Sequence, residues 1–551
     1  MDNKDLAELI FPNAKDSSYY EEKYPERNLP EGAIVTRFAP SPTGFVHIGS
    51  LYQALVADKV AKQTKGVFFL RVEDTDQKRE IENGVTEITN SLVDFGIVAD
   101  EGMLDDINEK GEYGPYKQSL RREIYQSYAK KLIEEGKAYP DFCSQEELNQ
   151  IRADQEAAGE RTGYYGKWAK YRNMPIDMAY EKIKAGDPYI IRMKSPGNPD
   201  KKIKHKDIIK GNIEMPENDV DEVIIKSDGL PTYHFAHAVD DHLMHTTTVI
   251  RSDEWLSSIP RHLQLFYILG FKPPRYAHIS PIMKLDNGAK RKLSKRKDPE
   301  AAVTYYKEIG VPKDAIKEYL LNIANSNFEI WRKQNPQKNI DEFTLELNKM
   351  GVSGALFDMV KLLDVSKGVI SKYTAQEIYD EALVWAKQYD EELKTLLEEQ
   401  KEYSLKVLNI ERGNAKPRKD IAKWSDVKEN IEYMFEEKFN EDESEYEFQK
   451  ITDIEKIKEI VAKYKEKYFD INDDKQTWFD KIKDLSEELG FAREVKLFKQ
   501  EPEKYEAHVG DVSTVLRVAI TKRHNTPDLY EIIQVLGKDT VLRRLEKWST
   551  M

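Results

Sequence analysis

Apolar and polar residues alternate along the first third of the chain with the periods of strands and helices. Short apolar runs at 33–38 and 67–75 predict buried strands. Each is followed by apolar residues at helical spacing, from about His47 onward and at 81–96. The order strand, helix, strand predicts a βαβ unit, and therefore a parallel sheet with a right-handed crossover.

The same alternation returns at 220–290. Residues 111–225 are irregular and rich in Tyr, Gly and Pro, and we interpret them as an insertion. After about residue 310 the strand signals fade, and apolar residues recur at helical spacing with charged outer faces. The pattern predicts a Rossmann-like α/β domain split by an insertion and followed by all-α helical bundles in the C-terminal part.

Composition narrows the class of protein. The 551 residues are 40% hydrophobic and 33% charged, and no run reaches the roughly 18 apolar residues that a membrane span needs. Because the first residues mix acids and bases, we expect a cytoplasmic protein. The one cysteine, Cys143, excludes an internal disulfide and a multi-cysteine zinc site. A net charge of −14 argues against a nucleic-acid partner, but basic strips on an acidic body still bind phosphates.

The loop APSPTGFVHIGS, residues 39–50, joins the first predicted strand to the first predicted helix. This setting predicts an anion site, because the free N–H groups and the dipole at a helix N-terminus favour phosphate. Gly44 and Gly49 remove side chains where a ligand or a neighbouring segment must come close. His47 can donate a hydrogen bond to phosphate. The alternatives are a plain turn and a histidine that only caps the helix.

The run KRKLSKRKD, residues 290–298, holds six basic side chains and follows a strand-like segment at 281–285. A mobile basic loop of this kind predicts closure over a polyphosphate and neutralisation of the charge on a transferring phosphoryl group. The alternative is a solvated lysine-rich loop.

These two elements resemble the signatures of one enzyme class. HIGS at 47–50 resembles the HIGH signature, and KLSKR at 292–296 resembles the KMSKS signature, of class I aminoacyl-tRNA synthetases. Further motifs resemble the bacterial-type glutamyl-tRNA synthetases: RFAPSPTG, RVEDTD (71–76), GPYKQS (114–119), GLPTYHFA (229–236), VDDHLM (239–244), VIRSDEW (249–255), HVGDVSTVLRVAITKRHNTPDL (508–529) and EIIQVLG (531–537). The resemblance runs through nearly the whole chain from about residue 33.

The resemblance implies a glutamate–tRNA ligase. Such an enzyme activates glutamate with ATP to glutamyl-adenylate and transfers it to the 3′ end of tRNA(Glu); charging of tRNA(Gln) stays open. The expected domains are an N-terminal extension (1–32), two halves of the Rossmann catalytic domain (33–110 and 221–310, the second with the KLSKR loop), an acceptor-binding insertion (111–220), a helical stem-contact region (311–370) and a helical anticodon-binding region (371–551).

The resemblance also implies site residues. The glutamate pocket would consist of Arg37, Ala39, Ser41, Glu73, Tyr233, His237 and Arg251. ATP would contact Ser41, His47, Gly49, Ser50, Glu254 and Lys295, and the catalytic residues would be His47, Lys292 and Lys295. Arg37 would grip a carboxylate bidentately, Glu73 would receive the α-ammonium group, and Arg251 would separate glutamate from glutamine.

The sequence departs from the family pattern at three positions. Ser50 replaces the second histidine of HIGH, Arg296 replaces the last serine of KMSKS, and His237 stands where relatives often carry Asn. Mg²⁺ is expected with ATP, but no resident metal and no zinc. The expected partners are tRNA(Glu) and L-glutamate, with no membrane, and the expected state is a monomer. The basic segments 201–210 and 412–423 are candidate tRNA contacts; the alternative is two solvated faces.

The sequence disfavours four other functions. Arg251 and the motifs APSPTG and RVEDTD argue against a glutaminyl-tRNA synthetase. The shortened enzyme that attaches glutamate to queuosine is disfavoured by the long helical C-terminal half. Nucleotidylyltransferases with a HIGH signature are usually much shorter. An inert RNA-binding relative would not need intact Glu73, Arg251, Lys292 and Lys295.

Overall fold

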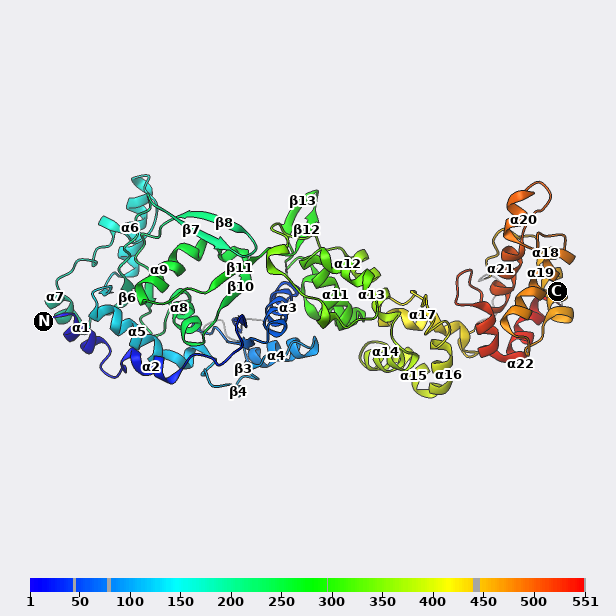
Figure 1. Cartoon of the computed structure of the whole chain (residues 1–551), viewed down its shortest axis with the longest axis horizontal. Coiled ribbons are helices and arrows are strands. Elements are labelled where there is room, and N and C mark those ends of the chain that lie inside the picture. The colour runs from blue at the N-terminus through cyan, green and yellow to red at the C-terminus, as the bar shows by residue number, and fades with distance from the viewer. Residues whose placement is uncertain (43–45, 77–80, 295, 440–445, 550–551) are drawn as a thin grey trace. The chain divides into compact units, whose positions relative to one another are not determined.

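The computed structural model describes residues 1–42, 46–76, 81–294, 296–439 and 446–549 (Figure 1). These residues form two compact units. Unit 1 comprises residues 1–305 and 317–358, and unit 2 comprises 306–316 and 359–551. In the described part of the chain, no helix is both long enough and apolar enough to cross a membrane.

Unit 1 contains the predicted βαβ element. Strand β1 (Val35–Phe38) pairs in parallel with β2 (Val67–Leu70), and α3 (Ile48–Gln63) connects them. The helix α4 (Gly84–Asp94) follows, and β3 (Glu101–Met103) and β4 (Glu109–Lys110) complete this sheet in the order β1-β2-β3-β4. The parallel pairing of β1 and β2 confirms the prediction from the apolar runs.

The second half of the α/β fold lies next to the first. Strand β10 (Thr248–Ser252) pairs in parallel with β11 (Arg275–Ile279), and Thr247 donates its backbone N–H to the Val35 carbonyl at 3.1 Å. The helices α8 (Tyr233–Leu243) and α9 (Ile259–Leu269) precede and connect these strands. The split Rossmann-like architecture is therefore confirmed.

The region between the halves is more regular than its composition predicts. It contains α5 (Arg122–Glu134), β5 (Ala138–Asp141), α6 (Gln145–Ala157), α7 (Ile176–Lys184), β6 (Ile190–Met193), β7 (Lys202–Asp207), β8 (Gly211–Pro216) and β9 (Val223–Ile225). The prediction of an irregular stretch was wrong because tyrosines here are core residues. Tyr125 and Tyr128 on α5 are fully buried.

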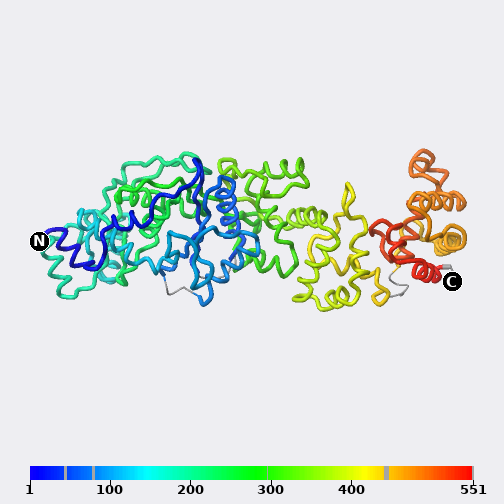
Figure 2. The backbone as a smooth tube through the Cα atoms, turned by 60° about the horizontal axis from the view of Figure 1, so that its bottom comes forward, coloured from blue at the N-terminus to red at the C-terminus, as the bar shows by residue number. Residues whose placement is uncertain are grey.

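The N-terminal segment runs over the surface of unit 1 (Figure 2, dark blue). It contains α1 (Asn3–Ile10) and α2 (Ser17–Lys23), and α1 packs on α5. Arg27 then donates two hydrogen bonds to the Glu101 carboxylate, at 2.7 and 2.9 Å, and one to the Met244 carbonyl at 3.0 Å. One arginine thus joins the segment to both halves of the fold.

The remaining elements are a hairpin and helices. The hairpin consists of β12 (Met283–Asp286) and β13 (Ala289–Lys292). The helices that follow are α10 (Val303–Ile309), α11 (Lys313–Ala324), α12 (Asn327–Gln334), α13 (Met359–Ile370), α14 (Ala375–Tyr389), α15 (Glu391–Glu399), α16 (Lys401–Leu408), α17 (Val427–Ile431), α18 (Ile454–Lys463), α19 (Lys475–Glu488), α20 (Val495–Gln500), α21 (Val509–Thr521) and α22 (Leu529–Ser549). Unit 2 is helical in its described residues, as predicted, and its buried core extends from Ile370 to Trp548.

Candidate active site

A cavity of about 710 Å³ lies in unit 1 at the carboxyl ends of β1, β10 and β11, beside the N-terminus of α3. Ligands of open α/β sheets bind at this edge. Of the thirteen residues expected in the site, eleven line this cavity: Arg37, Ala39, Ser41, His47, Gly49, Ser50, Glu73, Tyr233, Arg251, Glu254 and Lys292. Lys295 lies outside the described residues. His237 is the one that the cavity does not include.

Arg251 is a buried cation whose partners are neutral. Its side chain, 3% exposed, donates a hydrogen bond from Nε to His278 Nε2 at 3.0 Å. Nη1 lies 3.1 Å from His262 Nδ1 and 3.5 Å from Tyr233 Oη, and Nη2 lies 3.4 Å from the Trp255 carbonyl oxygen. Among the described residues, no carboxylate lies within ion-pair distance of this guanidinium. A buried charge without a counter-charge is costly, so this end of the cavity favours an anionic ligand.

Arg37, in contrast, belongs to an ion-pair network. Its Nε lies 3.3 Å from Asp241 Oδ1, which also accepts a 2.8 Å hydrogen bond from Arg71 Nη1. Burial opposes ionisation of Asp241, but Arg37 and Arg71 outweigh it and hold its pKa well below the usual range. The network fixes the Arg37 side chain at the wall of the cavity.

Glu73 is the acidic group on the same side. Its carboxylate lies 3.3 Å from Arg71 Nη2. Burial raises the pKa of Glu73 to about 7, although the nearby charges of Arg71 and Arg37 oppose the shift. The carboxylate therefore gains its charge near neutral pH, where a cationic ligand group would stabilise it.

His237 is separated from the cavity by its neighbours. It is fully buried, its ring is roughly parallel to the Tyr233 ring with 6.0 Å between centroids, and its Nε2 lies 3.0 Å from Tyr276 Oη. Its Nδ1 lies 2.8 Å from Asp241 Oδ2. Burial lowers the pKa of His237 to about 4. His237 therefore lies behind Tyr233 and Asp241 rather than at the cavity wall.

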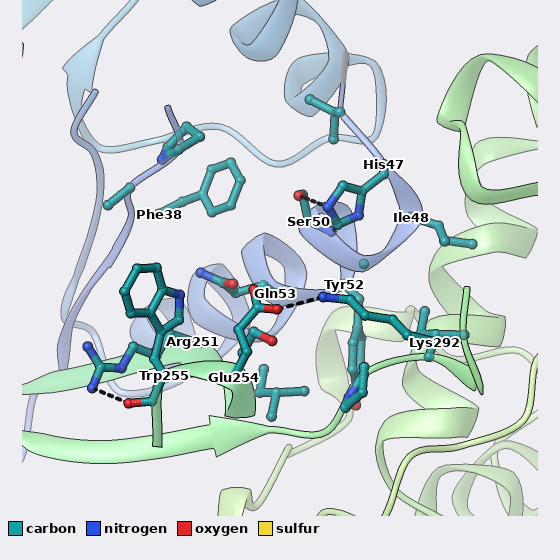
Figure 3. A pocket seen from close by; sticks show the side chains of 18 of the residues that line it. Phe38, His47, Ile48, Ser50, Tyr52, Gln53, Arg251, Glu254, Trp255 and Lys292 are labelled. Carbon is teal, nitrogen blue, oxygen red and sulfur yellow. Dashed lines mark hydrogen bonds and ion pairs between the residues drawn. The ribbon is translucent and has the colours of Figure 1, made fainter. Parts of the chain in front are cut away.

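His47 caps α3. Its Nδ1 accepts a hydrogen bond from the Ser50 backbone N–H at 3.0 Å, and Nε2 lies 3.0 Å from Ser50 Oγ (Figure 3). A Cβ at position 49 would lie 3.0 Å from the His47 ring. Gly49 therefore makes room for the imidazole, which is the close approach of a neighbouring segment that the sequence indicated. Gly44 lies outside the described residues.

The basic run 290–298 is only partly a loop. Lys290 to Lys292 belong to strand β13, so the prediction of a mobile loop was wrong for these residues. Arg291 makes a two-fold contact with Asp298, at 2.6 and 2.8 Å, and Asp298 also accepts the Ser294 backbone N–H at 2.9 Å. This buried aspartate therefore connects Arg291 of β13 to the backbone of Ser294. Lys292 Nζ, at the end of the strand, reaches Glu254 Oε2 at 2.8 Å (Figure 3).

Some lining residues were not predicted. The Trp255 ring lies on Tyr233 with 4.5 Å between centroids, and its carbonyl faces Arg251. Trp255 is part of the VIRSDEW motif, and an aromatic residue directly after two acids was the available signal. Arg71 and Asp241 do not line the cavity but hold Arg37 in place, and they were not predicted either. Charged residues inside otherwise apolar runs were their signal, because buried charges must be paired.

The candidate tRNA segments differ in exposure. On β7, Lys202, Lys204 and Lys206 are exposed, whereas Asp207 is buried. In unit 2, Arg412 is half-buried and donates to the carbonyls of Leu408 and Ile370 at 3.0 and 3.2 Å. In the described chain, no three His, Cys, Asp or Glu side chains gather as a metal site.

Comparison with known proteins gives matches over both units. Residues 33–363 match the family of class I tRNA synthetases (E and Q), catalytic domain, and residues 391–549 match the anticodon binding domain family. The glutamate–tRNA ligase of Clostridium beijerinckii is 50% identical over 98% of this chain and 99% of its own length. The glutamate–tRNA ligase of Acetivibrio thermocellus is 49% identical over 99% of this chain and 100% of its own length.

Solved structures give the same result. A glutamate tRNA ligase from Elizabethkingia meningosepticum, crystallised in complex with its amino acid, superposes with a TM-score of 0.72 at 27% identity, covering 94% of this chain and 99% of its own. The glutamate–tRNA synthetase of Elizabethkingia anophelis also gives a TM-score of 0.72, at 28% identity over 94% and 100%.

Proposed function

The chain belongs to the glutamate–tRNA ligase family of class I tRNA synthetases, and we propose that the cavity of unit 1 is the place where it joins glutamate to ATP. A ligase of this family uses ATP, glutamate and tRNA(Glu) as substrates. The observation that supports this proposal most directly is the buried Arg251 guanidinium with its neutral partners. It offers a charge that the side-chain carboxylate of glutamate compensates and the amide of glutamine does not.

The remaining glutamate contacts follow from charge and reach. Arg37, held by Asp241, offers a second guanidinium to a substrate with two carboxylates. Glu73 accepts the α-ammonium group. The Tyr233 hydroxyl donates a hydrogen bond to the substrate carboxylate beside Arg251. Ala39 and Ser41 complete the wall, and His237 supports Tyr233 from behind.

ATP is assigned to the other end of the cavity, at the N-terminus of α3. The free N–H groups and dipole of this 16-residue helix favour phosphate. His47, oriented by Ser50, faces the same space, and Lys292 supplies a cation opposite it. Glu254 contacts the nucleotide beside Lys292. We infer that Lys295 also contacts phosphate, because it is the second lysine of the KLSKR motif.

The reaction then needs positioning rather than a protein nucleophile. An oxygen of the glutamate α-carboxylate forms a bond to the α-phosphorus of ATP, and pyrophosphate leaves with the electron pair of the broken P–O bond. A terminal ribose hydroxyl of tRNA next attacks the activated carbonyl, and AMP leaves. His47 and Lys292 stabilise the charge that builds on the phosphate oxygens. Mg²⁺ would enter with ATP and would neutralise part of the phosphate charge, without a dedicated set of protein ligands.

The tRNA contacts proposed here are basic and exposed. Lys202, Lys204 and Lys206 share the outer face of β7 and would meet the acceptor arm. Lys416 and Lys419, both exposed in the segment 412–423, would meet tRNA in unit 2. Zinc is not expected, since Cys143 is the only cysteine. A monomer is the expected state.

Pyrophosphate exchange tests the proposal. With glutamate and tRNA(Glu) present, the protein should exchange labelled pyrophosphate into ATP, and Arg251→Gln should reduce kcat/KM for glutamate by about 10- to 100-fold, as expected for a lost hydrogen bond to a charged group. Exchange that is equally efficient in Arg251→Gln would contradict the assigned glutamate subsite. An inert binder would show no exchange.

A further inference from the structure

We propose that Asp207 and His278 are positioning residues that fix the direction of the Arg251 guanidinium, and that this chain of hydrogen bonds sets the preference of the cavity for a carboxylate over an amide side chain. The inference rests on the glutamate-binding role proposed above for Arg251. Neither Asp207 nor His278 lines the cavity.

The three side chains form one line of directional hydrogen bonds. Arg251 Nε lies 3.0 Å from His278 Nε2, and His278 Nδ1 lies 2.6 Å from Asp207 Oδ2. A guanidinium can only donate, so His278 Nε2 must carry no proton. The proton of the neutral imidazole is therefore on Nδ1, where it is donated to Asp207. All three residues are at most 3% exposed, so water does not compete for these bonds.

Asp207 is itself fixed. Its Oδ1 accepts the backbone N–H groups of Ile209 and Lys210, at 2.9 and 2.8 Å, and the His278 backbone N–H lies 3.2 Å from Oδ2. Burial opposes its ionisation, but the hydrogen bonds from His278 and these amides outweigh it and lower the pKa of Asp207. Burial lowers the pKa of His278, which keeps the imidazole neutral. An ionised Asp207 and a neutral His278 are the charge states that this series of hydrogen bonds requires.

The chain connects three segments of unit 1. The parallel register of β10 and β11 pairs Arg251 with His278, and β7 of the insertion supplies Asp207. Successive residues of a strand point to opposite faces. The face of β7 that carries Asp207 therefore meets the catalytic half, while Lys204 and Lys206 on either side of His205 point outward and are exposed.

The arrangement settles which nitrogens of Arg251 face the substrate. With Nε held by His278, Nη1 and Nη2 are the atoms beside Tyr233 and Trp255, which both line the cavity. A fork of two N–H groups binds a carboxylate bidentately only when its plane is fixed. Nη1 already lies 3.1 Å from His262 Nδ1, so without the bond to His278 the guanidinium plane would be free to rotate about that contact, and it would offer the substrate one donor instead of two.

The test uses the full-length protein in tRNA charging with glutamate and with glutamine. Asp207→Asn keeps the shape of the side chain but loses the charge that fixes the His278 proton. We expect the ratio of kcat/KM for glutamate to that for glutamine to fall about tenfold, mostly through KM for glutamate, with KM for ATP changed less than twofold. His278→Leu should do the same, and His278→Gln, which retains an acceptor, should lose less.

His205→Asn is the matched control. His205 lies on the same face of β7, and its ring packs on Tyr276 at 5.6 Å, but it makes no hydrogen bond to Arg251 in the described structure. It should keep the selectivity of the parent protein. Unfolding curves accompany each variant, and His278→Gln keeps the test open if Asp207→Asn is poorly folded.

The outcomes are distinct. If Arg251→Gln lowers selectivity but folded Asp207→Asn and His278→Leu keep it within twofold, the inference is overturned and the glutamate subsite stands. An equal loss in His205→Asn also overturns it, because packing alone would then explain the effect. If Arg251→Gln itself leaves selectivity unchanged, the proposed role of Arg251 fails, and the inference fails with it.

Discussion

Lys292 Nζ lies 2.8 Å from Glu254 Oε2, so two residues 38 positions apart form an ion pair at the wall of the cavity (Figure 3). Both side chains are more than half exposed, at 53% and 58%. An exposed pair of this kind contributes about 0–1 kcal/mol to stability. We therefore propose that these two residues serve ligand binding rather than folding.

Replacement of Lys292 separates the two roles. Lys292→Met should reduce kcat for pyrophosphate exchange by about 100-fold, the size of effect seen when one preorganised donor to a transition state is removed. The unfolding temperature should shift by less than about 2 °C, because the lost pair is exposed. Pyrophosphate exchange with tRNA present and a thermal melt measure the two quantities.

Lys290 provides the control for this experiment. It is exposed on the same strand β13 but does not line the cavity. Lys290→Met should retain parental exchange. If both variants lose activity equally, the general charge of the hairpin and not Lys292 is responsible.

The environment of Arg251 predicts that this residue favours glutamate binding at the expense of folding stability. Its buried guanidinium has neutral partners in the described structure, so its desolvation is not compensated by an ion pair. Arg251→Met should therefore leave the free energy of unfolding of unit 1 unchanged or raise it, while binding of glutamate is lost. Urea unfolding measures the first and pyrophosphate exchange the second. A loss of more than about 2 kcal/mol would indicate a structural role instead.

The raised pKa of Glu73 predicts a pH dependence of glutamate binding. With a pKa of about 7, the carboxylate loses its charge as the pH falls, and the α-ammonium group of glutamate loses its partner. KM for glutamate should rise about tenfold between pH 8 and pH 6, since each pH unit below the pKa reduces the ionised fraction tenfold. KM for ATP serves as the internal reference. In Glu73→Gln, KM should be high and independent of pH across this range.

Arg27 predicts a structural role for the N-terminal segment. Its side chain, 6% exposed, pairs with Glu101 and lies 3.9 Å over the Tyr113 ring. Arg27→Ala leaves Glu101 without its counter-charge and should cost about 3 kcal/mol. Limited proteolysis should then release residues 1–32 faster, with glutamate KM unchanged. Lys23→Ala, on the exposed part of the same segment, should have no such effect.

Part of the fold and site follows from local pattern alone. The runs around Val35 and Val67 have strand periodicity, and the residues between them have helical periodicity, so β1, α3 and β2 are predictable. The motifs that resemble the synthetase signatures also supply most of the cavity wall. Their side chains lie at strand ends and a helix start, where local sequence and position in the fold agree.

The remainder depends on contacts that local pattern does not encode. Asp207 lies 71 residues from His278, and its partner is known only once β7 packs on β11. His237 follows Tyr233 by one turn of α8 and stacks on its ring, so Tyr233 lines the cavity and His237 does not. The neutral partners of Arg251 come from four elements: Tyr233 on α8, Trp255 in the short helix Asp253–Ser258, His262 on α9 and His278 on β11. Such relationships arise from tertiary packing and need the structure.

Charging of two transcripts tests the central claim most directly. Labelled glutamate is offered to tRNA(Glu) and tRNA(Gln), with labelled glutamine as the control amino acid, using the parental protein and Arg251→Gln. We predict that the parental protein attaches glutamate to tRNA(Glu) with a much higher kcat/KM than glutamine, and that Arg251→Gln loses this preference. Glutamate on tRNA(Gln) would show a broader tRNA range. Binding of both transcripts with no attachment of glutamate to either would contradict the account.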